Sequence, residues 1–159
     1  MSHGVIAGLR ACIVVVLLGA VLVQAAVVPS YAADNARAFP EVAYLRWPYT
    51  VVADGAVGCV QVALLMIWAL LTMVSYGEIF TDRAFRRVDV IIGAGVVATL
   101  LSTGVWLHLF VIVGQGGLGA LFFASAAFVA GAGFVLLMVV MRSLLRSATV
   151  LRNELSEVV

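Results

Sequence analysis

Asp54 and His108 are ionisable side chains that lie inside long apolar runs of this 159-residue chain. A carboxylate can hold a cation or a proton, and an imidazole gains or loses its proton near neutral pH. Ionisable groups inside a membrane span are costly and commonly mark ion, proton or ligand sites. The pair is therefore a candidate ligand or proton site, with Gln24 and Gln61 at a similar depth. The competing interpretation places Asp54 at the wet rim of a span and His108 at the interface beside Trp106.

Patterns typical of catalytic and metal sites are missing from the sequence. Cys12 and Cys59 form no C-x-x-C motif and no cluster with histidine, so neither redox nor metal chemistry is indicated. His3 and His108 stand far apart, which gives no support for paired haem ligands. The glycine-rich turn at residues 114–119 carries no lysine, unlike a phosphate-binding loop. We expect no catalytic residue, no metal and no cofactor, and hence not an enzyme.

A second group of residues favours protein binding. The stretch Tyr76–Asp89 is the segment densest in charges and turn residues. Arginine and aromatic side chains are enriched at the hot spots of protein interfaces. The competing interpretation is that these arginines only set the membrane topology and contact lipid phosphates. The predicted partner-binding face comprises Phe80, Arg83, Phe85, Arg86 and Arg87, together with Arg146 from the C-terminal tail.

The elements that would position these residues are membrane-spanning helices. The chain is 65% hydrophobic and 11% charged, whereas a soluble domain is about half apolar and about a quarter charged. Four apolar runs, at about residues 11–28, 50–76, 88–113 and 118–141, approach the roughly 20 residues that span a bilayer. Because backbone groups in lipid must be satisfied internally, we predict an all-α fold, an integral membrane four-helix bundle, as a single domain over residues 1–159.

The placement of arginine predicts the orientation of the bundle. Seven arginines fall on one side of these spans, and only Arg37 and Arg46 fall on the other. Arginine-rich segments stay in the cytoplasm. We therefore expect a multi-pass protein of the cytoplasmic membrane, with both termini and the loop at residues 77–87 in the cytoplasm.

Two segments carry open alternatives or local predictions. The first apolar run, with Arg10 before it and Ser30–Ala33 after it, also resembles a cleaved signal peptide, although it is long enough to span as a retained helix. Residues 29–49 read as a loop. Thr81 is a good N-cap, and Phe80 and Phe85 have the spacing of a hydrophobic staple, so a helix should begin near Asp82.

The tail at residues 142–159 has apolar residues at near-helical spacing, separated by arginine and glutamate. Such an amphipathic helix can lie on anionic lipid headgroups. It can also serve as a docking helix for a soluble partner. The sequence leaves both interpretations open.

The segment Gly77-Glu78-Ile79-Phe80-Thr81, followed by Arg86-Arg87-Val88 and Ile91-Ile92-Gly93, also supports a family assignment. It resembles the signature loop of a bacterial family of four-helix membrane proteins known as domain of unknown function 2975. The resemblance implies a small membrane protein, often encoded beside a small helix-turn-helix regulator, and it implies no catalytic residue.

From these observations we expect a sensory or interaction protein that docks a cytoplasmic partner such as that regulator. The alternative is a small transporter or channel-like subunit with a polar site near Asp54 and His108. The expected partners are the lipid bilayer, the regulator and further copies of the chain, with no direct contact to nucleic acid.

Overall fold

The computed structural model describes residues 3–38, 40–75, 82–111, 114 and 117–157. Apart from Gly114 every described residue is helical, which confirms the all-α prediction. The elements are α1 (His3–Leu22), a π-helical segment η1 (Val23–Val27), α2 (Val28–Ala38), a 3-10 segment η2 (Pro40–Leu45), α3 (Arg46–Ser75), α4 (Asp82–Val111) and α5 (Gly117–Glu157).

Four helical segments are long and apolar enough to cross a membrane: Gly4–Asp34, Ala43–Ser75, Arg83–Val111 and Gly117–Val150. The first combines α1, η1 and most of α2. The molecule is a multi-pass membrane protein built as a four-helix bundle.

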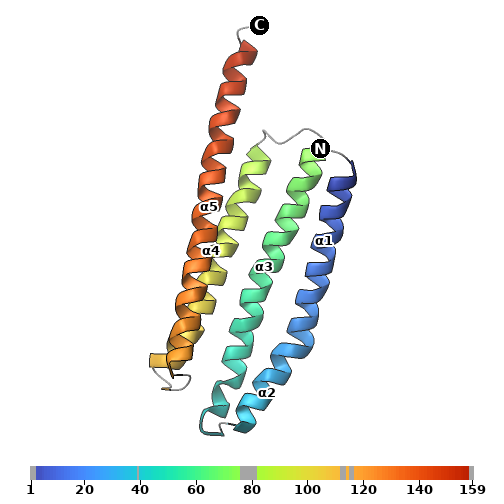
Figure 1. Cartoon of the computed structure of the whole chain (residues 1–159). Helices are drawn as coiled ribbons and strands as arrows, with labels where there is room; N and C mark the ends of the chain where they lie inside the picture. The colour runs from blue at the N-terminus through green and yellow to red at the C-terminus, as the bar shows by residue number, and fades with distance from the viewer. Residues whose placement is uncertain (1–2, 39, 76–81, 112–113, 115–116, 158–159) are drawn as a thin grey trace.

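The helices lie side by side in the order α1, α3, α4 and α5 (Figure 1). α4 packs on both α3 and α5, whereas α1 and α2 pack on α3. The chain exposes 10447 Å², over a third more than the roughly 7,600 Å² that surface scaling gives for a soluble monomer of this mass. Most apolar side chains therefore face outward, as a lipid environment permits.

This arrangement gives the bundle two distinct ends. We call the end where α1 and α4 begin and α3 stops the arginine end. The opposite end, where α2 leads into α3 and α4 stops, is the aromatic end. α5 starts at the aromatic end and runs past the arginine end (Figure 1).

The prediction of a loop at residues 29–49 is wrong, because most of this segment is helical. Pro29 lacks the N–H that an α-helix requires, and its ring crowds the carbonyl four residues earlier. Just before this proline the helix changes from α to the wider π form over Val23–Val27, and it then continues as α2. A π-segment relieves such crowding without ending the helix.

The link between α3 and α4 falls outside the described residues, so the predicted Thr81 cap and the Phe80–Phe85 staple do too. α4 begins at Asp82, where the sequence predicted a helix to begin. At the other end of α4, Gly114 and Gly117 have φ of 66° and 50°. That left-handed backbone favours glycine, which explains glycine at these two positions.

The predicted tail is not a separate element. α5 is one helix of 41 residues that continues through residue 142 without a break. Gly133 is its last glycine, and it contains no proline. Its C-terminal part extends beyond the other helices at the arginine end (Figure 1).

α4 and α5 approach each other closely at Gly131. A Cβ added there would collide with the side chain of Thr99, whose hydroxyl donates 2.7 Å to the carbonyl of Gly95. A Cβ on Gly95 would in turn lie 2.9 Å from the ring of Phe134. Small residues at such crossings let helix backbones approach closely in lipid.

We expect Gly131→Ala to destabilise the protein by about 1–3 kcal/mol, because the new methyl group overpacks the crossing. The matched control is Gly133→Ala, since no atom lies within 4 Å of a Cβ at that position. The control should leave stability unchanged or raise it by up to about 1 kcal/mol through helix propensity. Thermal unfolding of both variants in one detergent would measure the difference. Equal stability of the two variants would show that the α4–α5 crossing is looser than described.

Candidate functional site

Near the aromatic end, three polar residues join α3 to the π-helical segment before α2. Gln24 donates from Nε2 to the backbone carbonyl of Asp54 over 3.1 Å. Gln61 donates from Nε2 to Gln24 Oε1 over 2.8 Å. Gln24 lies within η1, and π-bulges are frequent at functional sites. We call Gln24, Asp54 and Gln61 the amide cluster.

The Asp54 carboxylate can accept a further hydrogen bond or bind a cation. Its Oδ1 is buried and has no hydrogen-bond partner. A buried polar atom without a partner carries a desolvation penalty and calls for an explanation, such as a bound proton, ion or water. The sequence-based prediction of a proton or ligand site at Asp54 therefore remains a prediction with a structural reason behind it.

His108 lies in a different contact. The hydroxyl of Tyr49 and Nδ1 of His108 are 2.6 Å apart, and the two rings meet edge to face. The described residues show no hydrogen bond between His108 and Asp54. The two candidate residues thus belong to separate contacts of α3: Asp54 contacts η1, and Tyr49 of α3 contacts His108 of α4.

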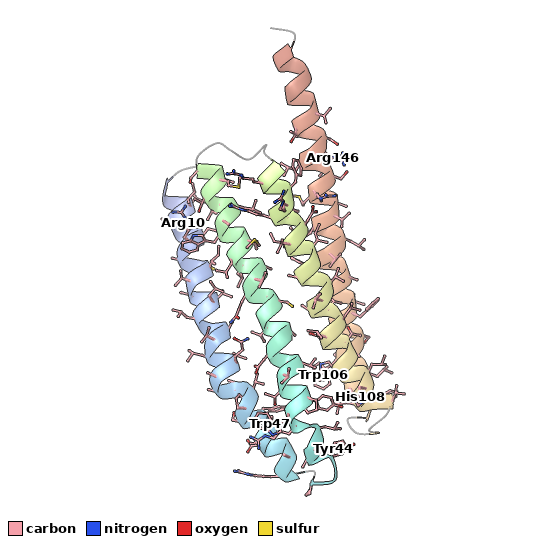
Figure 2. The ribbon with its side chains drawn as sticks, turned by 180° about the vertical axis from the view of Figure 1, so that it is seen from behind. Arg10, Tyr44, Trp47, Trp106, His108 and Arg146 are labelled. Carbon is pink, nitrogen blue, oxygen red and sulfur yellow. The ribbon has the colours of Figure 1, made fainter. Side chains whose placement is uncertain are left out.

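Aromatic side chains gather around His108 at this end of the bundle. Figure 2 shows Tyr44, Trp47 and Trp106 at the level of His108, while Arg10 and Arg146 lie toward the other end. Tyr and Trp concentrate at the membrane–water interface. Trp106 also stacks on Phe123 with ring centroids 5.1 Å apart, which ties α4 to α5.

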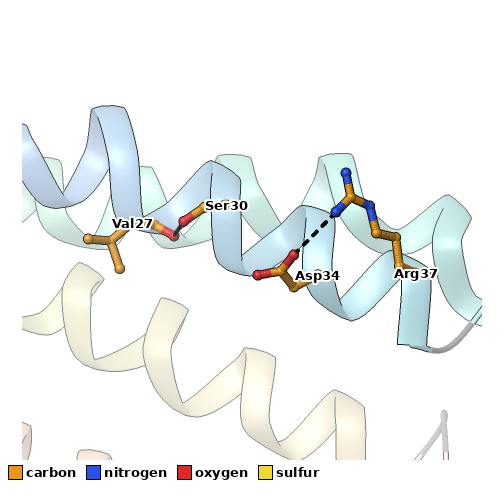
Figure 3. Close-up of polar contacts among 4 residues, drawn as sticks. All are labelled: Val27, Ser30, Asp34 and Arg37. Carbon is orange, nitrogen blue, oxygen red and sulfur yellow. Dashed lines mark hydrogen bonds and ion pairs between the residues drawn. The ribbon is translucent and has the colours of Figure 1, made fainter.

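The arginines of the aromatic end make only weak contacts. Arg37 forms an exposed ion pair with Asp34 over 3.7 Å, one turn along α2 (Figure 3). Ser30 caps the carbonyl of Val27 nearby (Figure 3). Arg46 lies 5.8 Å from the ring centroid of Trp47. Exposed pairs of this kind contribute little to stability.

At the arginine end, three guanidinium groups bind neighbouring helices. Arg10 of α1 donates to the hydroxyl of Thr72 over 3.3 Å and sits over the Trp68 ring at 5.7 Å. Arg87 of α4 donates to the carbonyl of Ala69 in α3 over 2.6 Å. Arg87 was predicted to bind a partner, and it already has one within the chain.

The third guanidinium belongs to Arg142 of α5. Its Nε lies 2.6 Å from Asp89 Oδ1, and its terminal nitrogen donates to Oδ2 over 3.0 Å. This ion pair joins α5 to α4 and places Asp89 and Arg142 at one level of the bundle.

The remaining arginines of the predicted face are exposed. Arg83, Arg86 and Arg146 make no ion pair or hydrogen bond among the described residues, and Phe85 beside them is half-buried. Phe80 lies outside the described part of the chain. The Asp89–Arg142 register sets Arg86 about 4.5 Å and Arg146 about 6 Å beyond that pair, at 1.5 Å per residue. We call Arg83, Arg86 and Arg146 the arginine face.

A shallow groove of about 650 Å³ runs between α3 and α4 near mid-length. Gly55, Gly58 and Gly93 leave it open, and Gln61 is its polar residue. Asp54 and His108 do not line it. Among the described residues no group of three His, Cys, Asp or Glu side chains could hold a metal ion.

Comparison with known families identifies the chain. The family model described as "Protein of unknown function (DUF2975)" matches residues 30–159, which include α3, α4 and α5. The chain belongs to this family. The DUF2975 match contains the arginine face and Asp54, while Gln24 and all of α1 precede it. No curated protein and no solved structure was found to match the chain.

Sequence reasoning missed most of the contacts that join the helices. It placed Gln24 and Gln61 at one depth but did not pair them. It gave Arg10 only a topological role and placed Arg142 on the amphipathic tail. The depth of each polar residue in its span can be estimated from the sequence. Pairing polar residues of equal depth could therefore have predicted the Gln24–Gln61 and Asp89–Arg142 contacts.

A double-mutant cycle should measure the Gln24–Gln61 contact. We expect Gln24→Leu and Gln61→Leu to show a coupling of about 0.6 kcal/mol, and no more than about 1.7 kcal/mol, as for other hydrogen bonds between membrane helices. Unfolding in mixed micelles gives the four free energies. The control pairs Gln24→Leu with Thr72→Val, which should be additive because these residues share no contact. Additivity of the two glutamine variants would show that no such hydrogen bond forms.

Proposed function

We propose that this DUF2975 protein is a sensory or interaction protein that docks a soluble cytoplasmic partner on its arginine face. The proposal rests on a difference between two groups of arginines. Arg10, Arg87 and Arg142 hold helices together, whereas Arg83, Arg86 and Arg146 are exposed and unpaired among the described residues. Unpaired arginines beside an aromatic residue fit the composition of interface hot spots.

The orientation supports this location. Seven arginines lie at or beyond the arginine end within the described helices, whereas Arg37 and Arg46 lie at the other, and Arg37 is paired with Asp34. The positive-inside rule then assigns the arginine end, both termini and the projecting part of α5 to the cytoplasm.

The chemistry of the face suggests the partner. Arg83, Arg86 and Arg146, which are unpaired among the described residues, favour carboxylates on an acidic protein surface. Each guanidinium can bind a carboxylate with two parallel hydrogen bonds. The family resemblance makes a small helix-turn-helix regulator the natural candidate. The chain itself would then bind the regulator and leave nucleic acid to it.

The alternative function, a small transporter or channel-like subunit, has a weaker basis. The amide cluster and the unpaired Asp54 Oδ1 supply a polar site within the spans. The groove between α3 and α4 lacks both Asp54 and His108 in its lining. A transport role would need a polar path that joins these residues.

Accessibility of single cysteines should verify the orientation. With Cys12 and Cys59 replaced by Ala, we expect a cysteine at Asn35 to react with an impermeant maleimide added to intact cells. Cysteines at Ser2, Ser75 and Ser156 should react only after the membrane is opened. Labelling of Ser2 or Ser156 from outside would reverse the assignment. An N-terminus near Ala33 on the mature protein would show that the first span is a cleaved signal peptide.

Loss of the arginine face should abolish partner binding. We expect Arg83→Gln with Arg86→Gln to reduce co-purification of a candidate helix-turn-helix regulator at least about tenfold, because arginine hot spots each contribute substantially. Quantitative immunoblotting after gentle detergent extraction would measure the bound regulator.

The matched control is Arg37→Gln with Arg46→Gln, which removes the same charge from the aromatic end. It should leave regulator binding unchanged. If the wild type captures no regulator under crosslinking, or if both double variants lose it equally, the docking function is wrong.

A further inference from the structure

An apolar seam runs along the second half of α5. Its residues alternate at intervals of four and three, the spacing of the core positions in a coiled coil. Such spacing keeps one stripe of a helix facing a parallel neighbour over many turns. The seam consists of Leu137, Met141, Leu144 and Ala148, and the sequence continues it with Leu151 and Leu155.

The seam faces away from the rest of the protein. Leu137, Met141 and Leu144 are 61%, 55% and 61% exposed, and Ala148 is exposed as well. The opposite side of α5 contacts α4 through Arg142. Leu144 lies roughly 160° around the helix from Arg142, at about 100° per residue. No other part of the described chain covers the stripe.

Lipid cannot cover the whole seam either. A helix of 41 residues is about 61 Å long, twice the roughly 30 Å of bilayer hydrocarbon. The end of α5 therefore stands in water beyond the other helices (Figure 1). Because no glycine or proline follows Gly133, nothing bends this part of the helix down onto the membrane surface.

We propose that the seam binds the same seam of a second copy of this chain, as a parallel two-helix coiled coil. Whatever binds the seam must contact α5 both inside the bilayer and in the water beyond it. Leu137 lies about 7.5 Å below the level of Arg142, toward the membrane centre, and the position of residue 155 is about 20 Å above it. A soluble protein cannot reach Leu137, and lipid cannot reach the far end. Another membrane-spanning helix of the same direction reaches both, and every copy supplies one.

The size of the seam indicates a reversible dimer. Nineteen residues extend about 27 Å, and a helix about 10–12 Å wide then covers roughly 300 Å² of each copy. This is well below the roughly 800 Å² per partner of stable complexes in solution. In a bilayer the two helices are already parallel, so less rotational freedom is lost on association. The dimer should therefore depend on protein density in the membrane.

Dimerisation would leave the arginine face free. Arg146 lies roughly 160° around α5 from Leu144, on the side away from the seam. The inference does not rest on the proposed docking function, and a dimer would present two arginine faces at once.

Disulfide formation in membranes tests the proposal on the full-length chain. With Cys12 and Cys59 replaced by Ala, Ala148→Cys places a thiol on the seam. Val150→Cys is the matched control, exposed and roughly 160° around the helix. We expect Ala148→Cys to form disulfide-linked dimers at least about tenfold faster under mild oxidation, since the bond requires Cα atoms within about 7 Å.

A charge on the seam should prevent this reaction. Adding Leu144→Glu to Ala148→Cys should lower crosslinking at least about tenfold, because a carboxylate would be buried between the helices. Adding Val150→Glu should not lower it. Reconstitution at decreasing protein-to-lipid ratio should reduce crosslinking in the parent variant.

Three results would overturn the proposal. Equal crosslinking at positions 148 and 150 would indicate random collision. Absence of crosslinking at position 148 with full maleimide reactivity would mean that the seam has no occupant. Protection of that thiol from maleimide without a disulfide would assign the seam to a different protein.

Discussion

The hydrocarbon solvent is the constraint on which this structure depends. Lipid tails are as apolar as leucine, so burial of apolar side chains between helices gives no net driving force. Only close backbone approach and a few polar contacts remain to hold the spans together. The chain uses the first at the Gly131–Thr99 crossing and the second at Arg87, Arg142 and the amide cluster. With so few contacts the helices form an open row, and a large apolar surface stays in lipid.

The four helices are not held together equally well. α3, α4 and α5 make the extensive packing of the protein, and they coincide with most of the DUF2975 match. The first span joins α3 chiefly at two levels, through Arg10 at one end and Gln24 at the other. A polar attachment in lipid is directional, because each donor needs its acceptor at one depth. It therefore holds the first span at a defined height without a tight interface.

The sequence predicted the architecture well because span length and composition are set by bilayer thickness. It also grouped the arginines at one end and placed the start of α4 at Asp82, because charges and caps act locally. It could not predict how each helix is rotated about its axis. Lipid-facing and protein-facing sides are both apolar here, so periodicity carries little information, and the partners of Arg87 and Gln24 stayed hidden. The helix through Pro29 was missed because a proline after an apolar run ordinarily ends a helix.

The unbroken course of α5 has a mechanical consequence. A helix without glycine or proline beyond Gly133 behaves as a stiff lever whose fulcrum is the crossing with α4. From Gly131 to the end of α5 the arm measures about 39 Å, so a tilt of about 5° displaces its tip by about 3 Å. A small tilt at the crossing with α4 therefore becomes a much larger movement at the C-terminal end of α5.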